Sequence, residues 1–103
     1  MLLADEVYQE NIYVNKNWTS FKRIAMSTGA DIELASFHST SKGLMGECGF
    51  RGGYVELNNF DPFALSQFLK LRSICLCSNT WGQMLTELMV NPPKKGRESD
   101  STV

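Results

Sequence analysis

The chain opens on an apolar run with no polar or turn-forming residue in front of it. Residues 1–5 read MLLAD, four apolar residues followed by Asp5. A short continuous apolar run is typical of a strand buried on both faces of a parallel sheet, with its first polar residue at the carboxyl end. Such a strand needs neighbouring strands and covering helices. We therefore expect an α/β fold, and a chain cut from a larger domain.

Further elements follow in the first half of the chain. Residues 9–18 are polar and predict a loop, and residues 19–28 place apolar side chains on one helical face. Thr19 or Ser20 can cap that helix and Gly29 can end it. Two further strands are predicted at residues 32–38 and at about residues 50–57.

The second half predicts two helices. Asp61 followed by Pro62 is typical of a helix start, and this helix would run to about Cys75 with several apolar residues facing a core. Another helix would begin near Thr80 or Trp81 and end before residue 91. The order strand, helix, strand, strand, helix, helix indicates an α/β domain with too few strands for a sheet of ordinary width.

Unusual polar residues follow the first two predicted strands. Asp5 and Tyr8 follow the first strand, and residues 39–42 follow the second. Ligands of open α/β sheets bind outside the carboxyl ends of the strands. We therefore expect these two groups to lie at the same edge of one sheet.

Composition limits the classes of partner. The formal net charge is −1 over 103 residues, which gives no electrostatic case for nucleic acid or an anionic membrane as a partner. No apolar run approaches the ~20 residues that span a bilayer. The first residues do not form a secretion signal, so we expect a cytoplasmic location, with a mitochondrial one open because a transit peptide would lie upstream.

Cysteine and histidine do not predict a metal site. Cys48, Cys75 and Cys77 are an odd number with poor disulfide spacing, which favours a reducing compartment. His38 and Cys48 lack the close ligand pairs of a zinc site. We expect no metal, and buried structural cysteines instead.

Lys42 stands in the stretch FHSTSKG, and a solvated turn lysine is the ordinary interpretation. The alternative is a pyridoxal phosphate site. Such a site needs an amine for the cofactor aldehyde, a carboxylate at the pyridine nitrogen, a hydroxyl at the phenolic oxygen, and an arginine with short donors for the phosphate. The chain supplies residues of all these kinds: Asp5, Tyr8, Ser39, Ser41, Lys42 and Arg51.

The segments that carry these residues resemble a known family. ADEVY, then SxSKG, then FRGGY, in this order, resemble the class I/II aminotransferases of fold type I, and the wider stretch ECGFRGGY is similar to their alanine aminotransferase branch. The resemblance covers about residues 1–90 and is weaker over residues 15–32. It implies that residues 1–90 are part of a three-layer αβα, pyridoxal-phosphate-binding large domain. Residues 91–103 are a polar tail, predicted to be disordered.

The resemblance also implies a role for each site residue. Asp5 would pair with the pyridine nitrogen and Tyr8 with the phenolic oxygen. Lys42 would form the Schiff base and then move the proton during transfer. Ser39 and Arg51 would hold the phosphate, with Ser41 as a weaker candidate.

The reaction implied is transfer of the amino group of L-alanine to 2-oxoglutarate, giving pyruvate and L-glutamate, in an enzyme that is a homodimer. Complete family members are several times longer than this chain, so we expect the chain alone to be inactive and to fold poorly. Two alternatives stay open. One is another class I/II aminotransferase, and the other is a non-catalytic remnant that at most binds pyridoxal phosphate.

Overall fold

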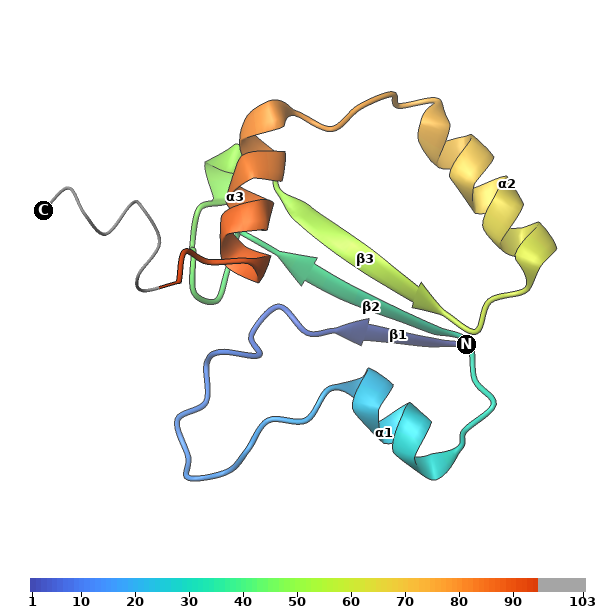
Figure 1. Ribbon diagram of the computed structural model, residues 1–103, viewed down its shortest axis with the longest axis horizontal. Helices are drawn as coiled ribbons and strands as arrows, with labels where there is room; N and C mark the ends of the chain where they lie inside the picture. The colour runs from blue at the N-terminus through green and yellow to red at the C-terminus, as the bar shows by residue number, and fades with distance from the viewer. Residues whose placement is uncertain (95–103) are drawn as a thin grey trace, which may run out of the picture.

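The computed structural model describes residues 1–94 and shows a three-stranded sheet with helices around it (Figure 1). This confirms the α/β class and the predicted order of elements. In chain order these are β1 (Leu2–Asp5), α1 (Phe21–Thr28), β2 (Leu34–Ser39), the short 3₁₀ turn η1 (Cys48–Phe50), β3 (Gly53–Asn58), α2 (Pro62–Ser73) and α3 (Thr80–Val90).

The helix ends are set by the predicted capping residues. The Ser20 hydroxyl accepts from the Arg23 amide at the start of α1, and Gly29 ends the helix in the left-handed conformation at φ 65°. The Asp61 carboxylate accepts from the Ala64 amide at 2.9 Å, with Pro62 as the first residue of α2.

Strand starts were predicted too early. β2 begins at residue 34 instead of 32, and β3 begins at residue 53 instead of about 50. The reason for the second difference is that Cys48–Phe50 forms a 3₁₀ turn, and Arg51 then takes a left-handed conformation at φ 54°. The backbone therefore becomes extended after these residues.

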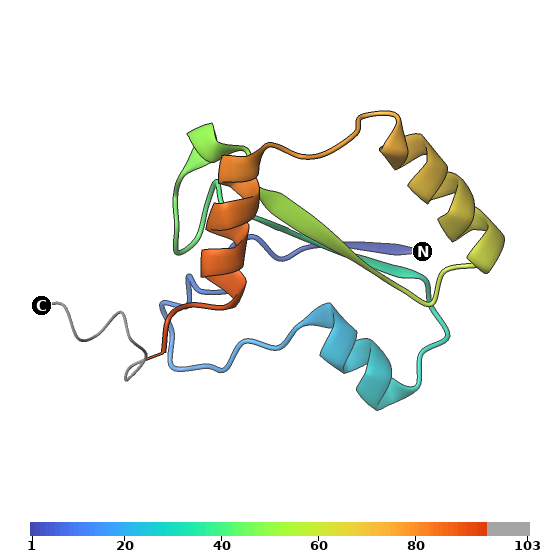
Figure 2. The same ribbon diagram turned by 45° about the horizontal axis from the view of Figure 1, so that its top comes forward.

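The strand order is β1-β2-β3, with β1 parallel to β2 and β3 antiparallel to β2. The register pairs Asp5 with Phe37 and Ser39 with Gly53. The carboxyl ends of β1 and β2 and the amino end of β3 therefore share one edge of the sheet, beside α3 and η1 (Figure 2).

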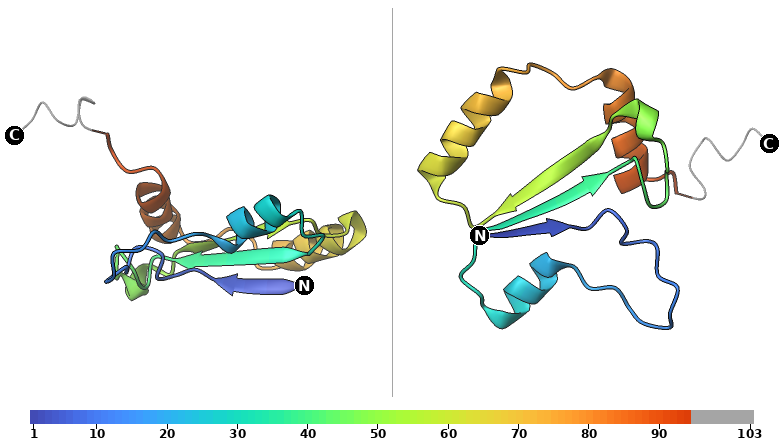
Figure 3. Two further views of the ribbon diagram at one scale, coloured as in Figure 1. Left: turned by 90° about the horizontal axis from the view of Figure 1, so that it is seen from below. Right: turned by 180° about the vertical axis from the view of Figure 1, so that it is seen from behind.

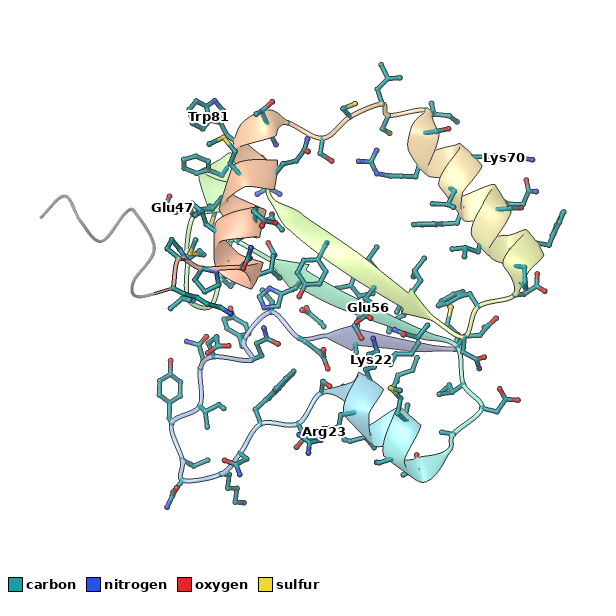
Figure 4. The ribbon with its side chains drawn as sticks, viewed as in Figure 1. Lys22, Arg23, Glu47, Glu56, Lys70 and Trp81 are labelled. Atoms are coloured by element: carbon teal, nitrogen blue, oxygen red, sulfur yellow. The ribbon has the colours of Figure 1, made fainter. Side chains whose placement is uncertain are left out.

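The two faces of the sheet are covered to different extents. α1 lies over one face (Figure 3, left), where Lys22 forms an ion pair with Glu56 of β3 (Figure 4). On the other face Leu3 and Phe37 are 59% and 40% exposed. The buried apolar residues within the described part of the chain are Ala4, Leu34 and Ala35.

The prediction that several apolar residues of α2 face a core is only partly confirmed. Leu65 and Phe68 line an apolar groove of about 270 Å³ together with the open sheet face. Phe63, Leu69 and Ile74 are exposed instead, because α2 flanks the β3 edge (Figure 1) rather than crossing the sheet.

The expectation of buried cysteines is wrong. Cys48, Cys75 and Cys77 are all exposed. α2 ends at Ser73, so Cys75 and Cys77 lie in the connection to α3, which arches away from the sheet (Figure 1).

Residues 91–94 form no helix or strand. The remainder of the predicted tail, residues 95–103, lies outside the described residues. No helix within residues 1–94 is both long and apolar enough to cross a bilayer.

We predict that the isolated 103-residue chain melts over a broad range and binds an apolar dye such as ANS, because one sheet face and most of α2 stay in contact with water. Thermal circular dichroism and dye fluorescence measure this. A sharp, reversible melt without dye binding would contradict the prediction.

Candidate functional site

Five of the six predicted site residues line one open pocket of about 690 Å³ at the shared sheet edge. They are Asp5, Tyr8, Ser39, Ser41 and Lys42. The first two end or follow β1 and the last three end or follow β2, as expected from parallel strands whose carboxyl ends meet. The pocket thus combines a carboxylate, a phenol, two hydroxyls and an amine.

Thr40 anchors the turn that carries Lys42. Its side chain is fully buried, and both its amide and its hydroxyl donate to the Gly52 carbonyl, at 3.1 and 3.2 Å. The Thr40 carbonyl in turn accepts from the Glu47 amide at 2.9 Å. These bonds fix the turn to the start of β3 and to the segment entering η1.

Gly43 brings the same turn against the loop that follows β1. It has φ +59°, and a Cβ built on it would lie 2.8 Å from the Val7 carbonyl oxygen. A residue with a side chain is disfavoured at this φ and would also collide with that oxygen. This close approach explains how Lys42 and Tyr8 come to line one pocket.

Asp5 and Ser39 are oriented by short-range hydrogen bonds. An oxygen of the Asp5 carboxylate accepts from the Val7 amide at 3.3 Å. The Ser39 hydroxyl donates to the Gly52 carbonyl at 3.3 Å and accepts from the Ser41 amide at 3.1 Å. Asp5, Tyr8 and Lys42 are all exposed, which leaves the carboxylate, the phenol and the amine accessible to a ligand.

Arg51 does not line this pocket. It lines a smaller one of about 210 Å³ that includes Gly52 and Gly82. Its Nη1 donates to the Cys48 carbonyl at 2.8 Å, so the guanidinium folds back on η1. The backbone of Arg51 nevertheless lies at the same sheet edge, because β3 starts two residues later.

Sequence reasoning considered His38 as a metal ligand and missed its actual contacts. The Ser39 amide donates to His38 Nδ1 at 2.8 Å, and the Gln9 side-chain amide lies 2.8 Å from His38 Nε2. The imidazole also stacks on Tyr54, with ring centroids 5.6 Å apart. No group of three or more potential metal ligands occurs within residues 1–94.

The Tyr54 phenol, which stacks on His38, has a perturbed acidity. Burial chiefly, and then the charges of Glu56 and Glu6, raise the pKa of the Tyr54 phenol. Each of these causes disfavours the phenolate, so the ring that supports His38 is neutral at physiological pH.

Comparison with curated proteins identifies the relatives of the chain. It is 55% identical over 103 residues to alanine aminotransferase 2 of Panicum miliaceum, which covers 96% of this chain and 21% of that protein. It is 56% identical over 97 residues to human alanine aminotransferase 1, covering 89% of this chain and 20% of the human protein. The chain is homologous to a stretch of the alanine aminotransferases.

A third alanine aminotransferase relative, named as probable and mitochondrial in Dictyostelium discoideum, is 52% identical over 104 residues. The chain spans about a fifth of the length of the alanine aminotransferases that it matches. No protein-family model matches the chain.

The high identity permits a test of the site in a chimera with one of these relatives. We define the chimera as the Panicum miliaceum alanine aminotransferase with residues 1–90 of this chain in place of the matching stretch. The rest of that protein supplies the elements outside the matched stretch.

Gly43 and Gly46 form a matched pair for a stability measurement in the chimera. Both have positive φ, but a Cβ on Gly46 meets no atom within 4 Å. We predict that Gly46→Ala costs about 1–2 kcal/mol through its backbone conformation alone. Gly43→Ala should cost about 1–3 kcal/mol more, because its Cβ also collides with the Val7 oxygen. Chemical denaturation measures both, and equal costs would show that the Gly43 contact is unimportant.

Proposed function

We propose that residues 1–90 are part of the pyridoxal-phosphate-binding large domain of a fold-type I aminotransferase of the alanine type. The observation that carries the proposal is the gathering of Asp5, Tyr8 and Lys42 around one pocket by segments more than 30 residues apart in the chain. The identity of 50% and more to alanine aminotransferases supports the same assignment.

The donor set of the pocket fits the cofactor. The volume of the pocket, about 690 Å³, is in the range of small-molecule sites, which is about 300–1,000 Å³. When bound, pyridoxal phosphate supplies a carbonyl that reacts with amines and a ring that accepts electrons. The Asp5 carboxylate would hold a proton on the ring nitrogen, because its negative charge favours the protonated form.

Lys42 and Tyr8 would carry the remaining chemistry near the cofactor carbonyl. The exposed Lys42 amine would bind that carbonyl and later move the proton between the substrate α-carbon and the carbon of the cofactor carbonyl. The Tyr8 hydroxyl would donate to the phenolic oxygen of the cofactor. Both groups already line the pocket in which the cofactor would bind.

The phosphate would be bound by Ser39, Ser41 and Arg51. The two serines line the pocket, whereas the Arg51 guanidinium would have to leave the Cys48 carbonyl to reach it. A charge-assisted hydrogen bond to phosphate is stronger than one to a neutral carbonyl, which favours that exchange when the anion is present.

The substrates we propose are L-alanine and 2-oxoglutarate, giving pyruvate and L-glutamate. The names of the relatives are the support for this choice. None of the proposed site residues is assigned to the substrate carboxylate. Another class I/II aminotransferase activity is the alternative. We further propose a homodimer and a cytoplasmic location, although some relatives are named as mitochondrial.

A second candidate is a non-catalytic remnant that at most binds pyridoxal phosphate. The sheet face that stays exposed within residues 1–94 favours it. The two candidates differ in what the chimera does, because a competent segment restores transamination and a degenerate one does not.

We predict that the chimera binds pyridoxal phosphate and transaminates L-alanine, and that Lys42→Arg lowers its activity by about 10²–10⁴-fold, because guanidinium cannot replace the amine. Lys70→Arg is the matched control, since Lys70 lies on α2 and points away from the fold (Figure 4). Coupled pyruvate detection measures the activity.

Reduction with borohydride and peptide mapping then locate the bound cofactor. Label on Lys42 with no turnover would favour the non-catalytic candidate. Label spread evenly over Lys22, Lys42 and Lys70 would overturn the proposed function.

A further inference from the structure

His38 makes contacts to both segments that carry the proposed site. Its Nδ1 accepts from the amide of Ser39, the last residue of β2 before the turn that holds Lys42. Its Nε2 lies 2.8 Å from the side-chain amide of Gln9, the residue next to Tyr8. The sheet edge thus has a side-chain link between the two halves of the pocket.

The shorter contact of Nδ1 favours one tautomer. Nδ1 lies 2.8 Å from the Ser39 amide, which donates to it when it carries no proton, and 3.3 Å from the Ser39 carbonyl, which would accept from it when protonated; the shorter contact favours the neutral ring protonated at Nε2. Nε2–H then requires an acceptor, which is the Gln9 amide oxygen once the amide is turned so that its oxygen faces the ring. In this arrangement both ring nitrogens are satisfied.

The imidazole is also fixed in its plane. It stacks on Tyr54 with an interplanar angle of 23°. Tyr54 is held on β3, directly opposite His38 in the register. The link therefore projects from the two-stranded β2–β3 ladder, and the loop after β1 is the more weakly held partner that it positions.

We propose that His38 is a positioning residue whose imidazole, through Gln9, holds the loop bearing Tyr8 against the end of β2 and the turn bearing Lys42. Its effect on cofactor binding rests on the proposed function, whereas the link itself does not. Besides the β1–β2 ladder, the two segments are joined by the Glu6 amide to the Phe37 carbonyl at 3.1 Å and by the approach of Gly43 to Val7.

Variants of Gln9 test the link without altering a proposed cofactor contact. In the chimera, Gln9→Met keeps the length of the side chain and removes its hydrogen bond. Gln9→Glu offers a carboxylate oxygen to Nε2–H and should rescue the link. Gln67→Met on exposed α2 is the matched control.

Two measurements separate the inference from the proposed function. Amide hydrogen exchange of residues 6–11, the loop that Gln9 belongs to, is measured without cofactor, and pyridoxal phosphate release is followed by absorbance. Gln9→Met should accelerate both by about five- to tenfold, the effect of losing one or two hydrogen bonds, while Gln9→Glu and Gln67→Met stay within about twofold of the parent.

His38→Phe, which keeps an aromatic ring on Tyr54 but has no nitrogen, should behave as Gln9→Met does. Unchanged exchange and release in both variants would overturn the inference, even with cofactor firmly bound. If both variants exchange faster in a chimera that binds no cofactor at Lys42, the result would support the link and overturn the proposed function.

Discussion

The site depends on the bonds that Thr40 makes to Gly52. Two donors of one buried residue share a single carbonyl, so the turn after β2 cannot leave the start of β3 without exposing both. Glycine at position 52 permits this arrangement. A Cβ there would collide with the Gly82 carbonyl and the Thr86 hydroxyl of α3, so the lack of a side chain lets α3 pack directly on the strand start. Lys42 is thus presented from a triple junction of β2, β3 and α3 rather than from a free loop.

The mixed sheet explains why three distant segments meet. A parallel pair aligns the residues after β1 with those after β2, and an antiparallel β3 returns its amino end to that same edge. Asp5, Lys42 and the backbone of Arg51 are therefore neighbours through topology, before any side chain makes a contact. The side chains then add the fine placement, with Gly43 closing the turn onto the Val7 carbonyl and His38 reaching Gln9.

Much of this could be predicted from local chemistry. The caps at Ser20 and Asp61 are short-range signals, and both were found because a capping oxygen and its amide are three residues apart. Three features depend on long-range contacts and could not be predicted: the burial of Thr40, the contacts of His38, and the exposure of the cysteines after α2. The direction of the Arg51 side chain could not be predicted either, since it follows from a left-handed backbone at the end of η1.

The open sheet face and the proposed chemistry share one requirement, which is the exclusion of water. A lysine amine and a carboxylate act strongly on a ligand when water is excluded, because electrostatic interactions weaken as the local dielectric rises. In residues 1–94 Lys42 and Tyr8 are exposed, and the apolar residues Leu3 and Phe37 border both the pocket and the neighbouring groove. An element laid over these apolar residues would cover the groove and close the pocket in one step, so assembly of the fold and activation of the site are expected to be a single event.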